Sequence, residues 1–196
     1  MINRASRGAL RMLRHFVYAM GNWRDGFSDN ETALVILLPS VDEELQGIKQ
    51  IVGVNSMSAH ITVLYPFARL SSVTGGFMSR LRCIIGEIDP FEFELSTIGW
   101  FGERVLYLVP TPPEPFQRMT QLLSDNFPDH LPYRGEFEEI VPHLTISEHA
   151  TLSRLRDAAR TASGLLPIYA EVNNVCLMAQ DGSGAWRIHT VFDLRH

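Results

Sequence analysis

Two short stretches of this chain repeat the order histidine, aliphatic residue, threonine, aliphatic residue. They are His60-Ile61-Thr62-Val63 and His143-Leu144-Thr145-Ile146. In an extended strand successive side chains point to opposite faces, so the histidine and threonine of each stretch share one face while the aliphatic residues face a core. Each stretch therefore presents an imidazole and a hydroxyl, roughly 6–7 Å apart along the strand.

Two imidazoles and two hydroxyls around one site suit the chemistry of phosphate esters. One imidazole acts as a base and the other as an acid, while the hydroxyls donate hydrogen bonds to phosphate oxygens. Chance accounts for about 0.4 His-x-Thr pairs in a chain of this composition, and both stretches here lie on apolar, strand-like runs. Each also has a proline nearby, Pro66 after the first stretch and Pro142 before the second.

With these flanks, HITVLYPF and PHLTI resemble the two signatures of the 2H phosphoesterase superfamily, which includes the 2'-5' RNA ligase-like proteins and the cyclic phosphodiesterases. The resemblance runs from about Ala33 to the C-terminus. It implies an α+β, bilobal, LigT-like fold with two pseudo-symmetric lobes of mainly antiparallel sheet, outer helices, one motif in each lobe and no metal. It also implies that His143 is the base and His60 the acid in opening a 2',3'-cyclic phosphate, an assignment that the residues alone leave open.

The resemblance has one departure. Many RNA ligase-like members carry an arginine a few residues beyond the second motif, where this chain has Ser147, Glu148 and His149. The departure argues against a long-RNA substrate. We therefore expect a phosphoesterase without metal or other cofactor, which hydrolyses a small cyclic nucleotide of the 2',3'-cyclic type or a 2'-5'-linked nucleotide phosphodiester. The alternatives are an RNA 2'-5' ligase and a non-catalytic module that binds a nucleotide or an RNA end.

Five further residues are candidates for substrate contact, because aromatic rings stack on bases and arginine pairs with phosphate. They are Tyr65, Phe67, Tyr133, Arg134 and Trp186. Each of the aromatic residues is also a typical core residue, and a loop arginine is often simply solvated, so both readings stay open. A metal site would recruit Glu148 or His149 beside the motif histidines, but the spacings typical of zinc ligands are missing.

The charge of the chain is uneven and bears on its partners. The formal net charge is −5; residues 1–30 hold five arginines against two aspartates, and the remaining residues hold 12 basic against 20 acidic side chains. Residues 31–196 are therefore too acidic to bind extended nucleic acid well, because such binding depends on basic side chains that neutralise phosphates. A small ligand with one or two phosphates is a better match. No apolar run approaches the roughly eighteen residues that span a membrane. Two cysteines form no disulfide framework, so we expect a cytoplasmic protein, as a monomer.

The pattern predicts two parts. Residues 1–30 form a basic extension with an apolar helical stripe, which is docked on the body, disordered, or a targeting or partner-binding helix. Residues 31–196 form the phosphoesterase domain. Hydrophobic periodicity predicts strands at 33–38, 91–95, 105–109, 141–147, 168–178 and 186–194 besides the first motif, and helices at 40–52, 72–85, 116–127 and 151–163. A capping box, Ser40 with Glu43, is expected to begin the first helix.

Overall fold

The computed structural model describes residues 31–195 except 54–57, 137–139 and 182–184, so the prediction for residues 1–30 lies outside the described residues. The described helices are α2 (Pro39–Glu44), α3 (Gln46–Val52), α4 (Gly75–Ile85), α5 (Glu114–Asn126) and α6 (Leu152–Ser163). The strands are β1 (Thr32–Leu37), β2 (His60–Leu64), β3 (Phe91–Phe101), β4 (Val105–Thr111), β5 (Leu144–Ser147), β6 (Ile168–Val172), β7 (Asn174–Gln180) and β8 (Trp186–Asp193).

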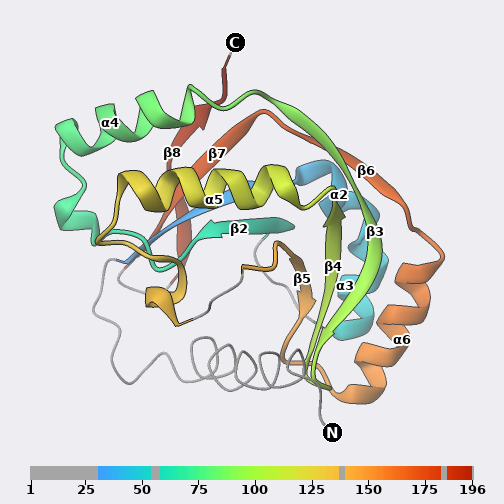
Figure 1. Cartoon of the computed structure of the whole chain (residues 1–196). Coiled ribbons are helices and arrows are strands. Elements are labelled where there is room, and N and C mark those ends of the chain that lie inside the picture. Colours follow the sequence, from blue (N-terminus) through green and yellow to red (C-terminus); the bar gives the residue numbers. More distant parts are fainter. Residues whose placement is uncertain (1–30, 54–57, 137–139, 182–184, 196) are drawn as a thin grey trace, which may run out of the picture.

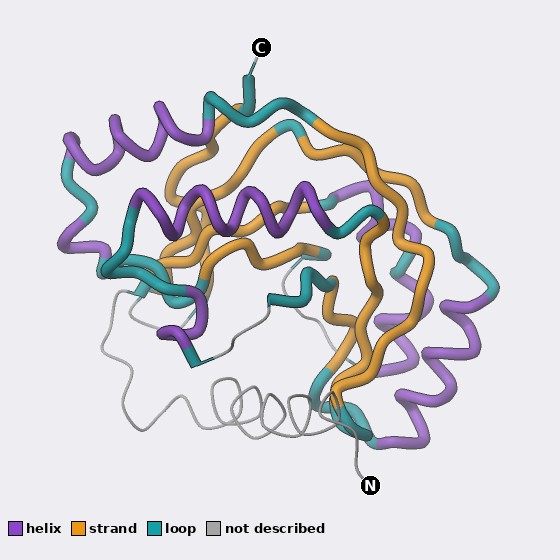
Figure 2. Tube along the Cα trace, in the orientation of Figure 1, coloured by secondary structure: helices purple, strands orange, loops and turns teal. Residues whose placement is uncertain are grey.

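All eight strands belong to one sheet with the order β6-β3-β4-β5-β2-β1-β7-β8, and each neighbouring pair is antiparallel. The two motif strands, β5 and β2, are therefore adjacent at the middle of the sheet. Three strands flank them on each side. The sheet curls strongly, with helices around its outer side (Figures 1 and 2).

The sheet divides into two lobes of four strands, each ending at a motif strand. The first lobe contains β2, β1, β7 and β8, and the second contains β5, β4, β3 and β6. Strands from the C-terminal part of the chain thus complete the first lobe, as the red β7 and β8 beside the blue β1 show in Figure 1. This arrangement confirms the expected α+β, bilobal fold with pseudo-symmetric antiparallel lobes and outer helices.

The main hydrophobic core lies between the sheet and the helices. The aliphatic motif residues point into it: Ile61, Val63, Leu144 and Ile146 are all buried in this core. Helix α5 packs on β2, where Thr120 Oγ1 donates a hydrogen bond to the Val63 carbonyl at 3.0 Å, and α3 packs on α6 and β5. Because the motif strands bury one face in this way, their histidines and threonines occupy the opposite face of the sheet, hereafter the histidine face.

Two features of the predicted elements are wrong. The expected strand 168–178 is two strands that separate at Asn173: β6 pairs with β3 in the second lobe, and β7 pairs with β1 and β8 in the first. The alternation of apolar and polar residues breaks at this point, where Asn173 and Asn174 follow each other and the next apolar residue is Val175. The capping box is also not formed, because α2 begins at Pro39 and has no side-chain cap hydrogen bond. Thr74 and Thr151 do cap α4 and α6.

Among the described residues, no helix is long and apolar enough to cross a membrane.

Candidate active site

The two motifs face each other crosswise. In the antiparallel pairing of β2 with β5, Ile61 is opposite Leu144. This is the one paired position of the two strands in the described residues, and an ideal antiparallel register continued from it would set Thr62 opposite His143 and His60 opposite Thr145. In that register each histidine would have the hydroxyl of its own motif two residues along its strand and the other motif's hydroxyl across from it, at the usual spacing of about 5 Å between Cβ atoms. A local twofold axis through the Ile61–Leu144 pair relates the two halves.

The two imidazoles are held in the same way. The Nδ1 atom of His60 lies 2.9 Å from the carbonyl oxygen of Ser58, and the Nδ1 atom of His143 lies 2.7 Å from that of Val141. A carbonyl oxygen only accepts hydrogen bonds, so Nδ1 carries the hydrogen in both rings. In the neutral ring Nε2 is then the basic nitrogen, and in the charged ring Nε2–H is the proton that can be given away. The hydrogen bond from Nδ1–H to the carbonyl therefore suits a histidine that acts as a base and one that acts as an acid.

Burial lowers the proton affinity of both histidines. His143, 8% exposed, has its pKa lowered to about 4 by burial, against the raising effect of the Val141 carbonyl, and the charge of His60 lowers it further. The pKa of His60 is also lowered by burial, which outweighs the Ser58 hydrogen bond, and the charge of Lys49 adds to the lowering. The effect of His60 on His143 places the two rings in one electrostatic environment.

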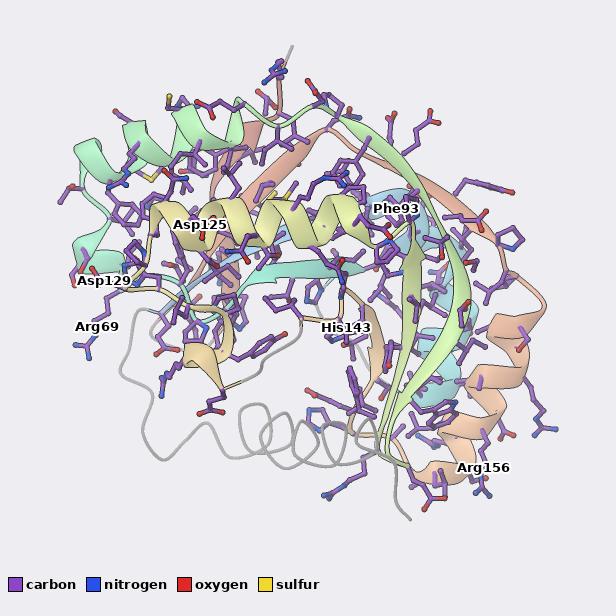
Figure 3. All side chains as sticks on the ribbon, in the orientation of Figure 1. Arg69, Phe93, Asp125, Asp129, His143 and Arg156 are labelled. Atoms are coloured by element: carbon purple, nitrogen blue, oxygen red, sulfur yellow. The ribbon has the colours of Figure 1, made fainter. Side chains whose placement is uncertain are left out.

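Aromatic rings of the second lobe pack against His143, which lies near the centre of the molecule in Figure 3. The rings of Phe101 and Tyr107 stack with their centroids 4.2 Å apart, and their centroids lie 5.2 and 5.3 Å from that of His143. Tyr107 lies across Gly99 of the neighbouring strand. A Cβ atom at Gly99 would be 2.2 Å from the Tyr107 ring, so the ring can occupy this position only when residue 99 is glycine.

Four of the five predicted substrate-binding residues gather beyond the end of β2. The Tyr65 and Trp186 rings meet edge to face, with centroids 5.8 Å apart. The Tyr65 hydroxyl donates to Glu31 at 3.3 Å, and Arg134 forms an ion pair with the same carboxylate at 3.3 Å. The Tyr133 amide donates to the Tyr65 carbonyl at 2.7 Å. This group joins the first motif strand to the loop that precedes the second.

The loop residues Tyr133 and Arg134 adopt left-handed backbone conformations, with φ of 49° and 58°. Such conformations are unfavourable for residues with a Cβ atom, by about 1 kcal/mol or more each, and persist where the surroundings impose them. Here the Tyr65 carbonyl and Glu31 hold the turn. The Tyr133 side chain meanwhile packs on the cluster of Phe101, Val105 and Tyr107, and burial raises its pKa to about 12.

Phe67 lines a cavity together with Glu31 and Arg134 of this group. Its ring is 5% exposed and packs against Phe77, Phe127 and His130 in the main core. Phe67 thus packs in the core, and its role in substrate contact stays a prediction. Sequence reasoning missed Phe101 and Tyr107 as neighbours of His143, and Gly99 as the residue that makes room for the Tyr107 ring. A glycine within a strand was the available signal, because it often marks the close approach of another group.

Glu148 and His149, which the alternative metal site would combine with the motif histidines, contact each other. His149 Nε2 lies 3.2 Å from Glu148 Oε1, and burial raises the pKa of Glu148. Within the described ranges, no group of three or more His, Cys, Asp or Glu side chains is placed to hold a metal ion.

Solved structures share this fold. A crystal structure of TT0787 of Thermus thermophilus matches with a TM-score of 0.62 and 17% identity, covering 84% of this chain and 98% of that protein. E. coli LigT matches in complex with 3'-AMP, with a TM-score of 0.56 and 18% identity, and in its apo form, with a TM-score of 0.57 and 19% identity. Both LigT matches cover 86% of this chain and 100% of LigT. At these identities the likeness shows the fold.

The sequence itself points to the same family. No curated protein matches the chain. Residues 39–184, which contain both motifs and most of the sheet, match the 2'-5' RNA ligase superfamily. The resemblance to the 2H phosphoesterases is confirmed by this match together with the shared fold. The chain therefore belongs to the 2'-5' RNA ligase superfamily of 2H phosphoesterases.

Proposed function

We propose that this protein is a phosphoesterase that hydrolyses a small nucleotide phosphodiester, of the 2',3'-cyclic or 2'-5'-linked type, without a metal ion. The observation that carries the proposal is the pairing of the two motif strands at Ile61 and Leu144, with both imidazoles tethered through Nδ1 to backbone carbonyls; continued along the strands, this pairing sets the two histidines and two threonines crosswise about one local axis. A phosphate group on that axis meets an imidazole Nε2 on each side, as in-line displacement at phosphorus requires.

In this proposal His143 is the base and His60 the acid. His143 Nε2 takes a proton from water, whose oxygen forms the new bond to phosphorus. The bond from phosphorus to a ribose oxygen breaks, and His60 Nε2–H gives that oxygen its proton. The deeper burial of His143 supports the assignment, because its pKa of about 4 leaves it neutral when one proton is shared by the pair.

Thr62 and Thr145 bind the non-bridging oxygens of the phosphate. Both side chains are half-buried on the histidine face. In the part of the chain that the structure describes, neither hydroxyl forms a hydrogen bond to the protein, so both are available to a ligand. Fixed donors of this kind stabilise the charge that develops in the transition state. Structures of LigT with 3'-AMP and with phosphate support a nucleotide-sized, phosphate-bearing ligand.

The test is turnover after exhaustive chelation. We expect the chelated protein to hydrolyse 2',3'-cyclic AMP or a 2'-5'-linked dinucleotide at the same rate as the untreated protein, because both proton carriers are side chains. Loss of activity on chelation and its recovery with a divalent ion would overturn the metal-free mechanism. Tight binding of 3'-AMP without turnover of either substrate would instead favour the non-catalytic module, and joining of RNA ends would favour the ligase.

A further inference from the structure

The two halves of the site are alike in backbone but unlike in charge. In each lobe, a helix begins after the strand next to the motif strand, and its fourth residue reaches the backbone just before the motif histidine. In the second lobe this residue is Gln117 of α5, whose amide donates to the Ile140 carbonyl at 3.4 Å. In the first lobe it is Asp42 of α2, whose carboxylate accepts the Ala59 N–H at 2.5 Å. At equivalent positions of the two lobes, the second lobe thus has a neutral amide where the first has a carboxylate.

The carboxylate of Asp42 holds a cation as well. The oxygen that accepts the Ala59 N–H also accepts a hydrogen bond from Lys49 Nζ of α3. Two donors to one oxygen lie within about 6 Å of each other, so the ammonium group is close to the backbone of the residue that precedes His60. Lys49 is the only lysine in the sequence. Its side chain is 21% exposed, so water screens its charge only in part.

Asp42 is ionised in this arrangement. Burial alone would raise its pKa, but the hydrogen bonds from Lys49 and Ala59 and the charge of Lys49 hold the pKa below its usual value. The backbone of Ala59 is fixed from both sides, because its carbonyl also accepts the Leu38 N–H at 2.8 Å. The direction of the His60 ring depends on this short segment, through the bond from Nδ1 to the Ser58 carbonyl.

We propose that Asp42 and Lys49 are positioning residues that make the first half of the site chemically unequal to the second: Asp42 fixes the backbone that directs His60, and Lys49 keeps a positive charge beside that ring. The inference deepens the proposed function and rests on it. The charge of Lys49 on α3 acts on His60, the ionised Asp42 of α2 pairs with Lys49, His60 and His143 share one electrostatic environment, and β1 places Leu37 opposite His60.

A fixed cation has a chemical consequence at this place. It repels the proton on His60 and so makes His60 a stronger acid, and it attracts an anionic phosphodiester. The second lobe has no equivalent charge in Gln117. The two histidines thus share one backbone geometry but differ in their electrostatic surroundings: the charge of Lys49 acts on His60 and favours release of its proton to the leaving oxygen.

The test is an NMR titration of the histidine rings of the full chain without substrate, with the His60 signal identified by its loss in His60→Gln. In Lys49→Met we expect the His60 pKa to rise, because the cation is removed and the Asp42 charge is left uncompensated. Lys49→Arg should restore the original value. Arg160→Met is the matched control: it removes one positive charge from an 80% exposed side chain of α6 and should change nothing at His60.

Turnover gives the second readout. In Lys49→Met the alkaline limb of the kcat/KM profile should move to higher pH with the His60 titration, while the acid limb stays in place. Asp42→Asn, which keeps an acceptor for the Ala59 N–H, should retain more kcat than Asp42→Ala. An unchanged His60 titration in folded Lys49→Met would overturn the role of Lys49, and equal kcat in the two Asp42 variants would overturn that of Asp42. The titration needs no substrate, so it tests the roles of Asp42 and Lys49 even if the protein fails to hydrolyse the proposed substrates.

Discussion

Replacing either motif histidine with alanine is expected to reduce kcat/KM on a 2',3'-cyclic nucleotide by roughly 10²–10⁴-fold, the usual contribution of a positioned proton carrier. Both rings hold Nδ1 on a backbone carbonyl, so proton transfer falls to Nε2 in each. Because acid and base act in the same step, the double variant should be little worse than either single variant.

The controls separate chemistry from folding. His189→Ala removes an exposed histidine of β8 and should leave the rate unchanged. Since His143 packs against two aromatic rings, His143→Gln is a second variant that keeps a polar side chain of similar length. Thr62→Val and Thr145→Val should lower kcat less than the histidine variants, because each removes one donor to the phosphate. A His60 or His143 variant that is folded and retains most of its activity would refute the two-histidine mechanism.

Gly99→Ala is expected to disturb the site without touching a motif residue. The new methyl group would meet the Tyr107 ring at 2.2 Å, well inside van der Waals contact, so the ring must leave its place beside His143. We expect a loss of about 1–3 kcal/mol in the free energy of unfolding, typical of an overpacked core, and a fall in kcat. Urea denaturation and steady-state kinetics measure the two effects.

A second glycine, Gly47, provides the control for this prediction. Gly47 lies in α3, where an added Cβ would meet nothing within 4 Å. Gly47→Ala should therefore stabilise the protein by up to about 1 kcal/mol, as alanine does within a helix, and leave kcat unchanged. The double variant Gly99→Ala, Tyr107→Val should recover stability by removing the clash. Wild-type stability and rate in Gly99→Ala alone would show that the Tyr107 ring has no fixed role beside His143.

The sequence predicted the parts of this site that depend on local pattern. A period of two along His60 to Val63 and along His143 to Ile146 suffices to separate a polar face from a buried one, and the structure has that separation. The helices and most strands follow in the same way from amphipathic spacing. The pairing of β7 with β1 does not, because a strand's partner depends on contacts between distant segments rather than on its own alternation.

The surroundings of the histidines depend on tertiary packing and could not be predicted from spacing. The stack of Phe101 and Tyr107 on His143 needs the β3–β4 register, and the link from Asp42 to the backbone before His60 spans a helix and a strand. The same limit applies to proton affinity. Two histidines with unperturbed pKa values would give an optimum near neutrality, whereas burial of both rings moves the expected optimum to lower pH.

The pH dependence of kcat/KM in metal-free buffer tests the central claim most directly, because it reports the protonation of the free acid and base. The base must be neutral, so the rate should rise with pH through the pKa of His143, about 4. The acid must be protonated, so the rate should fall with pH through the lowered pKa of His60. The account predicts a bell with its maximum between about 4 and the unperturbed value near 6.5.

The kcat profile, which reports the complex, should lie at higher pH than the kcat/KM profile, because a bound phosphodiester anion favours the protonated rings. The two limbs belong to the coupled pair, and the residual activity of each single-histidine variant should keep one limb and lose the other. A kcat/KM profile with a single limb, or a bell that keeps both limbs after removal of His60 or of His143, would contradict an acid–base pair acting across one phosphate.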